Sequence, residues 1–308
     1  MKIVVELTSG FCNARCVWCF SQYDTGLTVT KGFTSLINFK RFINLNKGFQ
    51  DPFFHHILFR KKKSDFSIVP FSKGEALLNP EFIDIIDYAV SKRVPLYHIH
   101  TNLAMDLTPE HLKALCKHQK VTVNFGGGNK QTHYQNMKTD FDKVLLNLKR
   151  LAYFKRITRS KVTIQAKMVI NKRNVNEVSL LRRKVKKISK RITVGTTEIL
   201  FSCSNSSNED KLKFIEENLG REIPCRDKWR ISKGKVIVSP KIKRCYGRVP
   251  TVRWDGAVQI CCRAKSHEGI VGNAFEESMK KILTSSVYKK AMILGAKRKY
   301  VPFCKFCS

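Results

Sequence analysis

Acidic residues are scarce in this chain: 24 Asp and Glu accompany 58 Lys and Arg, which gives a formal net charge of +34 over 308 residues. This shortage excludes a surface on which the two signs of charge balance. A field of this size favours a polyanionic partner such as DNA or RNA, or an anionic membrane surface. A coding bias toward Lys, Asn, Ile and Phe is the alternative explanation, although it does not account for the shortage of acids.

Long apolar runs are missing as well. No stretch of eighteen or more apolar residues occurs, and the N-terminus lacks a basic segment followed by an apolar segment and a cleavage site. We therefore expect no transmembrane segment, no export and a cytoplasmic location. Because the cytosol keeps thiols reduced, the eleven cysteines are expected to be ligand sets and not disulfides.

Three of these cysteines share one short loop, Cys12-Asn-Ala-Arg-Cys16-Val-Trp-Cys19, directly after an apolar run over residues 3–7 that predicts a first strand. Thiolates are the usual ligands of iron-sulfur clusters, and a four-iron cluster normally takes four of them. A cluster held by three cysteines keeps one iron open for a substrate or cofactor. For the spacing alone, a zinc knuckle or scattered core cysteines remain the alternatives.

The spacing and position of this loop resemble those of the radical S-adenosylmethionine (radical SAM) enzymes, whose cluster loop follows the first strand and whose open iron holds SAM. At the end of the next predicted strand, residues 66–71, the segment Lys73-Gly74-Glu75 is similar to the Gly-Gly-Glu motif of that family. The resemblance implies that Glu75 and a carbonyl near Gly74 bind the SAM ammonium group. Lys73 stands at the usual first glycine, where it either aids a carboxylate or phosphate or points away.

Weaker correspondences with the family follow on later predicted strands. Asn102 lies in a segment that resembles the Thr-Asn-Gly turn, with Leu103 in place of glycine, and Asn124 stands for a serine that faces the SAM ribose. Gly126 stands where the family has an acid, and the glycines over residues 126–128 either let backbone approach a ligand or form a flexible turn.

The long predicted strand over residues 162–170 adds two further candidates for the SAM site. Gln165 and Lys167 alternate with apolar residues, so we expect both side chains to point into the barrel toward SAM.

Apolar segments alternate with segments of helical periodicity through the first two thirds of the chain. The predicted strands lie over residues 3–7, 66–71, 96–100, 121–125, 162–170 and 198–201. This alternation predicts an α/β fold, a partial (βα)6 TIM-like barrel over residues 1–204. Active sites in such barrels lie at the carboxyl ends of the strands, where Cys19, Glu75, Asn102 and Asn124 all fall.

A polar, turn-rich segment over residues 202–210 predicts a domain boundary, and we expect residues 205–308 to form a linker followed by a small α+β domain. This part has a hairpin turn over residues 253–258 and a Gly-Asn helix start near Asn273. Its cysteines are Cys245, Cys261, Cys262, Cys304 and Cys307. The order of these features resembles the SPASM or shortened twitch extension of radical SAM enzymes.

The second resemblance implies one auxiliary four-iron cluster, and of the adjacent pair it favours the first cysteine. The implied ligands are Cys245, Cys261, Cys304 and Cys307. A structural zinc held by four cysteines is the alternative for this site.

Taken together, the resemblances imply an enzyme in which an electron from the first cluster cleaves SAM to methionine and a 5′-deoxyadenosyl radical that abstracts hydrogen from a substrate. A reductant such as flavodoxin or ferredoxin is the expected electron donor. The charge predicts that the substrate is a nucleic acid or another polyanion, because residues 141–191 hold 17 Lys and Arg and 2 acids, 17 − 2 = +15. The alternatives are a SPASM-type peptide maturase, a dehydrogenase of a sugar or aminoglycoside-like molecule, and a nonenzymatic iron-sulfur protein that binds nucleic acid.

Overall fold

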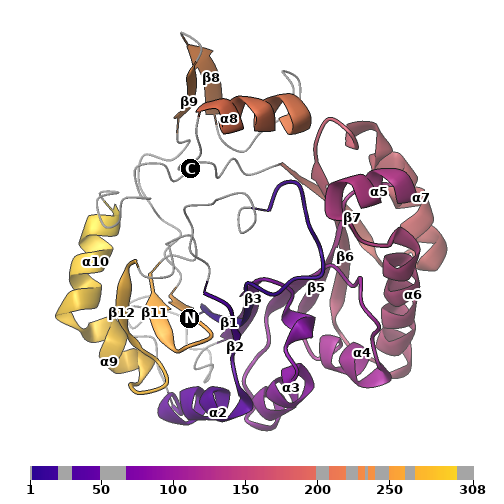
Figure 1. The fold of residues 1–308 in the computed structure, drawn as a ribbon. Helices are drawn as coiled ribbons and strands as arrows, with labels where there is room; N and C mark the ends of the chain where they lie inside the picture. The colour runs from indigo at the N-terminus through magenta and orange to yellow at the C-terminus, as the bar shows by residue number, and fades with distance from the viewer. Residues whose placement is uncertain are drawn as a thin grey trace, which may run out of the picture.

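Parallel strands curve around the centre of the molecule and helices lie outside them (Figure 1). The computed structural model describes residues 2–19, 30–48, 67–198, 208–219, 228–232, 235–239, 250–260 and 268–296. In these ranges the parallel strands are β1 (Lys2–Ser9), β3 (Ser67–Lys73), β4 (His98–Thr101), β5 (Lys120–Phe125), β6 (Thr163–Ile170) and β7 (Thr193–Glu198). They pair in that order, and a bridge between Ile68 and Leu96 joins β3 to the segment before β4. The predicted α/β partial (βα)6 barrel is confirmed.

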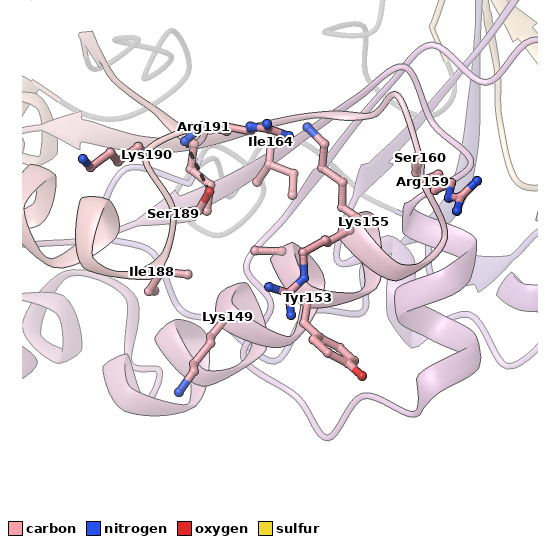
Figure 2. A pocket seen from close by; sticks show the side chains of 13 residues that line it. Lys149, Tyr153, Lys155, Arg159, Ser160, Ile164, Ile188, Ser189, Lys190 and Arg191 are labelled. Carbon is pink, nitrogen blue, oxygen red and sulfur yellow. Dashed lines mark hydrogen bonds between the residues drawn. The ribbon is translucent and has the colours of Figure 1, made fainter.

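Helices between these strands cover the outer face of the sheet. They are α2 (Leu36–Leu45), α3 (Phe82–Ser91), α4 (Pro109–Leu115), α5 (Lys130–Met137), α6 (Phe141–Ile157) and α7 (Val178–Ile188). The local sequence favours the observed start of α4, because Thr108 and His111 form a capping box and Pro109 occupies the first turn. Helices α6 and α7 both end at the amino ends of β6 and β7, where a pocket opens between them (Figure 2).

Side chains alternate across β6 as the pattern of its sequence predicts. Ile164, Ala166 and Met168 are buried in the hydrophobic core under the helices. Gln165 and Lys167 occupy the alternate positions and are only half-buried, so they lie on the opposite face, toward the barrel interior, called the lumen below.

The C-terminal part of the chain extends the barrel sheet beyond β1. Its elements are β10 (Thr251–Val252), β11 (Ala257–Gln259), β12 (Ile270–Asn273), α9 (Met279–Thr284) and α10 (Ser286–Ala296). Strand β10 pairs in parallel with β1, Val4 opposite Thr251, and the antiparallel β11 and β12 follow. The predicted hairpin turn is confirmed, with Gly256 at a φ of 88°. Val258 and Leu283 lie in the same hydrophobic core as β1, so this part packs as a continuation of the barrel.

Two predictions about the chain after β6 need correction or lie outside the described residues. The sixth strand begins earlier than predicted, because β7 covers Thr193–Glu198, and the predicted strand residues 199–201 lie outside the described residues. β-branched threonines fit a pleated strand as well as apolar residues do, and β7 is rich in them. The predicted boundary between residues 204 and 205 also lies outside the described residues.

Smaller elements complete the described chain. They are β2 (Gly32–Phe33), η1 (Ala76–Leu78), η2 (Val175–Glu177), α8 (Asn208–Phe214), η3 (Ile215–Leu219), β8 (Lys228–Ser232) and β9 (Lys235–Ser239). Strand β2 pairs with the carboxyl end of β1, while β8 and β9 pair with each other. Within the described part of the chain, every helix is too short or too polar to cross a bilayer.

Candidate active site

The cysteine loop, residues 12–19, follows β1 at the carboxyl end of the barrel and is fixed first against the end of β3. The Gly10 N–H donates to the Lys73 carbonyl at 3.1 Å, and the Glu75 N–H donates to the Phe11 carbonyl at 2.8 Å. A Cβ on Gly74 would lie 2.2 Å from the Phe11 carbonyl oxygen. Only glycine therefore allows the Lys73-Gly74-Glu75 segment to approach the cysteine loop this closely.

Helix α5 holds the far side of the cysteine loop. The Arg15 N–H donates to the Met137 carbonyl at 2.8 Å, and the Val17 N–H donates to the Asn136 carbonyl at 2.9 Å. This helix was not predicted from the sequence. Its start has a recognisable signal, because the Asn129 side chain accepts a hydrogen bond from the backbone N–H of Thr132.

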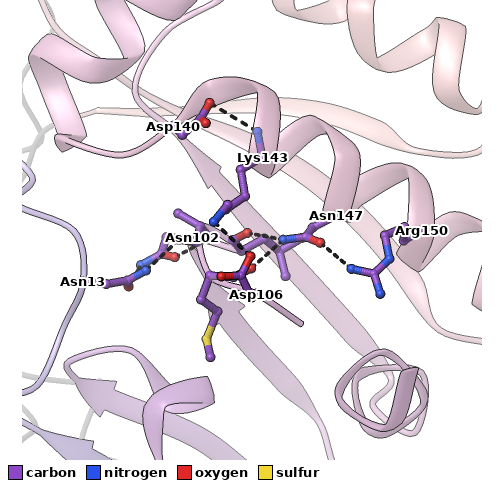
Figure 3. A network of polar contacts seen from close by, with 10 residues as sticks. Asn13, Asn102, Asp106, Asp140, Lys143, Asn147 and Arg150 are labelled. Atoms are coloured by element: carbon purple, nitrogen blue, oxygen red, sulfur yellow. Dashed lines mark hydrogen bonds and ion pairs between the residues drawn. The ribbon is translucent and has the colours of Figure 1, made fainter. Parts of the chain in front are cut away.

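The turn after β4 fixes the middle of the cysteine loop (Figure 3). Asn13 accepts a hydrogen bond from the Asn102 side-chain amide at 2.8 Å and donates to the Ala104 carbonyl at 2.9 Å. Asn147 of α6 donates in turn to the carbonyls of Leu103 and Met105. The chain of contacts connects the cysteine loop through this turn to α6.

Leu103 occupies the position where the resembling turn has glycine, and its backbone shows why glycine is common there. Its φ is 52°, in the left-handed region that an L side chain rarely adopts. The Leu103 side chain is fully buried in the core, and this burial offsets the backbone cost.

The three thiols of the cysteine loop are close enough to influence one another's charge. Burial raises the pKa of Cys12 to about 11, and the negative charges of Glu75 and Cys19 add to the rise. Burial also raises the pKa of Cys16, with further contributions from Cys19, Cys12 and Glu75. Three thiols and a carboxylate thus share one region, in which a cationic metal core would offset the repulsion between the ionised groups.

A single metal ion and a four-iron cluster need different arrangements of the same ligands. Within the described residues, no group of three or more His, Cys, Asp or Glu side chains is arranged to hold a metal ion. In a four-iron cluster each thiolate binds a different iron, and soft thiolates are its usual ligands. The three loop cysteines, Cys12, Cys16 and Cys19, fit that donor chemistry.

Glu75 lies under the cysteine loop with its carboxylate held by backbone donors. It is 3% exposed, and it accepts hydrogen bonds from the Leu77 N–H at 3.2 Å and the Asn102 N–H at 2.8 Å. Burial raises the pKa of Glu75, and these two donors oppose the rise. The Asn102 side chain also lies 3.9 Å from the Cys12 sulfur, so Asn102 contacts both Glu75 and the first cysteine.

Lys73, the residue that departs from the glycine motif, lies beside a different carboxylate. Burial raises the pKa of Glu6, and the positive charge of Lys73 is the largest effect that opposes the rise, followed by the Lys73 N–H and the charge of Arg253. The Trp254 N–H also donates to Glu6. Arg253 donates to Thr30 at 2.7 Å. The hairpin between β10 and β11 is thereby tied to β1, β3 and the segment after the cysteine loop.

The remaining predicted SAM contacts lie on the lumen wall. Asn124 of β5 and Lys167 of β6 are register partners, and both are half-buried. Gln165 accepts a hydrogen bond from the Thr122 hydroxyl at 3.3 Å. These residues face the lumen as predicted, and their contact with SAM stays a prediction.

Two histidines of β4 lie on the same wall and were not predicted as site residues. The rings of His98 and His100 lie 4.2 Å apart between centroids. His98 Nε2 lies 2.8 Å from the Thr122 hydroxyl, which donates to Gln165 and so accepts from His98. Burial, with the charges of nearby groups including Lys167, lowers the pKa of His98 to about 4 and that of His100 to about 3. Both rings are therefore neutral near pH 7, and their alternation on a lumen strand was the available sequence signal.

The three glycines after β5 serve close packing. Glu177 accepts hydrogen bonds from the Gly128 N–H, the Asn129 amide and the Thr132 hydroxyl, each at 2.7 Å. A Cβ on Gly128 would lie 2.6 Å from the Glu177 carbonyl oxygen. The segment is neither a free turn nor an open ligand cradle, because Glu177 binds it to the start of α7.

The predicted auxiliary-cluster ligands lie outside the described residues. They are Cys245, Cys261, Cys304 and Cys307, together with the adjacent Cys262.

This chain resembles known proteins in the sequence of one segment and in its fold. Residues 245–308 match the SPASM family model, described as an iron-sulfur cluster-binding domain. A search of curated proteins finds no match. The solved structure of anSMEcpe with bound AdoMet is similar, with a TM-score of 0.60 and 15% identity, over 99% of this chain and 87% of that chain.

Two further solved structures have a similar fold. BtrN in complex with AdoMet and 2-DOIA gives a TM-score of 0.55 and 15% identity, over 100% of this chain and 92% of BtrN. Streptococcus suis SuiB bound to precursor peptide SuiA gives 0.59 and 12%, over 99% of this chain and 70% of SuiB. The chain therefore shares its fold with these AdoMet-bound and peptide-bound structures, and its C-terminal residues 245–308 match the SPASM iron-sulfur model.

Proposed function

We propose that this protein is a radical SAM enzyme whose first four-iron cluster is held by Cys12, Cys16 and Cys19. When bound, this cluster supplies the electron that cleaves SAM to methionine and a 5′-deoxyadenosyl radical. Glu75 gives the SAM ammonium group a buried counter-charge, and the carbonyl of Gly74 is its neighbouring acceptor.

The proximity of the cysteine thiols to the Glu75 carboxylate is the observation that supports this proposal most strongly. The Glu75 carboxylate raises the pKa of Cys12, and Asn102 contacts both groups. A buried carboxylate beside a metal-binding loop is suited to a cationic, chelating ligand such as the amino group of SAM. Four residues are the proposed contacts for the rest of SAM: Asn102 in the turn after β4, and Asn124, Gln165 and Lys167 on the lumen wall.

An auxiliary four-iron cluster is the second part of the proposal. Its proposed ligands are Cys245, Cys261, Cys304 and Cys307, which lie within the segment that matches the SPASM model. The contacts of Arg253 and Trp254 with Thr30 connect the described part of this segment to the chain that follows the cysteine loop.

For the substrate we propose a peptide in place of the nucleic acid that the net charge favours. The support is that anSMEcpe has been solved with a bound Cp18Cys peptide and SuiB with a precursor peptide. A small polar molecule is the second candidate, because the similar BtrN structure holds 2-DOIA. The neutral imidazoles of His98 and His100 and the amide of Gln165 give the lumen hydrogen-bonding groups for either substrate. A flavodoxin or ferredoxin remains the proposed electron donor.

Deuterium transfer tests the proposed function and the substrate class together. Reconstituted protein is reduced under anaerobic conditions and supplied with SAM and either a fully deuterated peptide digest or a deuterated small-molecule extract. We expect 5′-deoxyadenosine that carries deuterium from the peptide fraction. Transfer from the small-molecule fraction alone would select the second candidate, and absence of SAM cleavage in cluster-loaded protein would reject the enzyme proposal.

A further inference from the structure

A basic pocket of about 830 Å³ lies at the amino ends of β6 and β7, at the opposite end of the barrel from the cysteine loop. The side chains around it come from the second half of α6, the end of α7, the segments that follow these helices, and Ile164 of β6 (Figure 2). None of its lining residues is acidic, and six are cationic: Lys149, Lys155, Arg156, Arg159, Lys190 and Arg191.

The backbone on both walls of the pocket is ordered by hydrogen bonds. On the α6 side, the Ser160 N–H donates to the Lys155 carbonyl at 3.0 Å, and Arg159 between them has a φ of 51°. This closes the helix with a turn of the kind that usually takes glycine. On the α7 side, the Arg191 N–H donates to the Ser189 hydroxyl at 3.2 Å. The cations therefore project from two fixed turns, which lowers the entropy cost of binding an anion between them.

Stabilisation of a helix end by nearby cations explains only some of the positively charged residues around the pocket. Lys155 and Arg156 lie in the last turn of α6, where a cation stabilises the helix end. Arg159, Lys190 and Arg191 lie beyond the helix ends and belong to the pocket walls. The acids of these two helices, Asp142 and Glu177, lie at the opposite ends and leave the pocket without a counter-charge from them.

The charge continues from the pocket along the exposed surface of α7. Arg183 and Lys187 are exposed and lie four residues apart on one side of this helix, with Lys190 and Arg191 just beyond its end. A single phosphate would contact only part of such a row. The spacing suits several negative charges in succession along a chain.

We propose that this pocket and the adjoining side of α7 bind a chain of linked phosphates. The source is either a nucleic-acid strand or free polyphosphate, which share the same oxygen acceptors and charge spacing. Guanidinium groups bind phosphate oxygens in pairs, and Arg156, Arg159 and Arg191 supply three of them around the pocket. The site is separate from the proposed SAM site, so binding there does not depend on the proposed reaction.

The test measures affinity in cluster-loaded, full-length protein with three probes at several salt concentrations: tripolyphosphate, a single-stranded 20-mer and polyglutamate. The pocket variant replaces Arg156, Lys190 and Arg191 with Gln. A matched control replaces the exposed Lys280, Lys289 and Lys290 of α9 and α10 with Gln and removes the same charge.

We expect the pocket variant to lose at least tenfold in affinity for both phosphate probes, and the control to lose less than threefold. For the 20-mer, three lost contacts flatten the plot of log affinity against log salt by about 2, at about 0.7 per phosphate on a single strand. Tighter binding of the 20-mer identifies nucleic acid as the source, and tighter binding of tripolyphosphate identifies free polyphosphate.

Three results would overturn the proposal: equal losses in the two triple variants, equal binding of polyglutamate, or no phosphate binding at near-physiological salt. The single variants Lys190→Gln and Arg191→Gln provide the same comparison if the triple variant does not fold. Unchanged SAM cleavage in the pocket variant separates this outcome from that of the proposed function.

Discussion

At the carboxyl end of the barrel, Glu6, Glu75 and Glu177 all accept hydrogen bonds from backbone N–H groups, whereas at the amino end the cations around Arg156 and Arg191 face an open pocket. At the carboxyl end each carboxylate orders a segment near a strand end: Glu6 holds Lys73, Glu75 holds the turn after β4, and Glu177 holds the glycine segment after β5. The basic end has side chains with no lining acid to balance them. In a chain with few acids, these three carboxylates therefore order backbone segments, whereas the pocket at the amino end contains no acid. The variants below test this comparison.

The largest expected effect comes from adding one methyl group at the acidic end. Gly74→Ala places a Cβ 2.2 Å from the Phe11 carbonyl oxygen, so the backbone before the cysteine loop must move. We expect loss of the first cluster and at least a hundredfold loss of SAM cleavage, measured as 5′-deoxyadenosine formed. Gly195→Ala is the control, because its Cβ meets only the end of the Gln165 side chain and should keep the cluster. Normal iron content in the Gly74 variant would contradict the packing argument.

Removing the charge of Glu75 should have the next largest effect. Glu75→Gln keeps the shape but loses the counter-charge for the SAM ammonium group, which weakens SAM binding by about 1.5 to 3 kcal/mol. That range corresponds to roughly 10- to 150-fold in dissociation constant, measurable by equilibrium binding. Glu277→Gln, in a partly exposed ion pair with Lys281, controls for the loss of one negative charge. Equal SAM affinity in the two variants would remove Glu75 from the site.

The free energies of unfolding of two variants compare the carboxyl and amino ends of the barrel directly. Glu177→Gln cannot accept all three hydrogen bonds that fix the glycine segment, and we expect a loss of about 1 to 3 kcal/mol in the free energy of unfolding. The triple change of Arg156, Lys190 and Arg191 to Gln should stay within about 0.5 kcal/mol of wild type or gain slightly, because it relieves repulsion. Anaerobic denaturant titrations measure both. A greater loss in the triple variant would reverse the comparison.

The smallest effect concerns the lumen between the two ends. An unfolded histidine binds a proton below about pH 6.5, while the folded pKa is about 4 for His98 and about 3 for His100. Between these values the unfolded chain binds more protons, so stability rises with pH from about 3 to 6.5 and is lost as the pH falls through that window. His98→Asn with His100→Asn should flatten this part of the stability curve. An unchanged slope, or NMR midpoints near 6.5 for both rings, would contradict their desolvation.

Much of the barrel could be predicted because its strands carry strong local signals. The apolar, β-branched run of β1 predicts that strand, and the alternation of polar and apolar residues in β6 predicts both the strand and which side chains it buries. The capping residue Thr108 favours the start of α4. Helix α5 could not be found in this way, because over Lys130–Met137 few residues are apolar and periodicity has little to act on. Its contribution to the cysteine loop comes from two backbone carbonyls, which leave no trace in the side chains.

The parts of the site that were not predicted depend on long-range contacts. The parallel pairing of β10 with β1 joins residues about 250 positions apart, and no local pattern specifies it. Lys73 could not be placed from the sequence, since its neighbour Glu6 lies on another strand. The role of Glu177 in the glycine segment likewise appears only when α7 packs against the loop after β5.

Iron content and SAM cleavage in one triple variant test the central claim most directly. Wild-type protein reconstituted under anaerobic conditions should bind about eight irons, as two four-iron clusters, and convert SAM to 5′-deoxyadenosine with a strong reductant. Replacing Cys12, Cys16 and Cys19 together with Ala should leave about four irons in the auxiliary cluster and abolish cleavage. An unchanged iron count with cleavage retained, or zinc without iron in protein made under anaerobic, iron-replete conditions, would contradict the account.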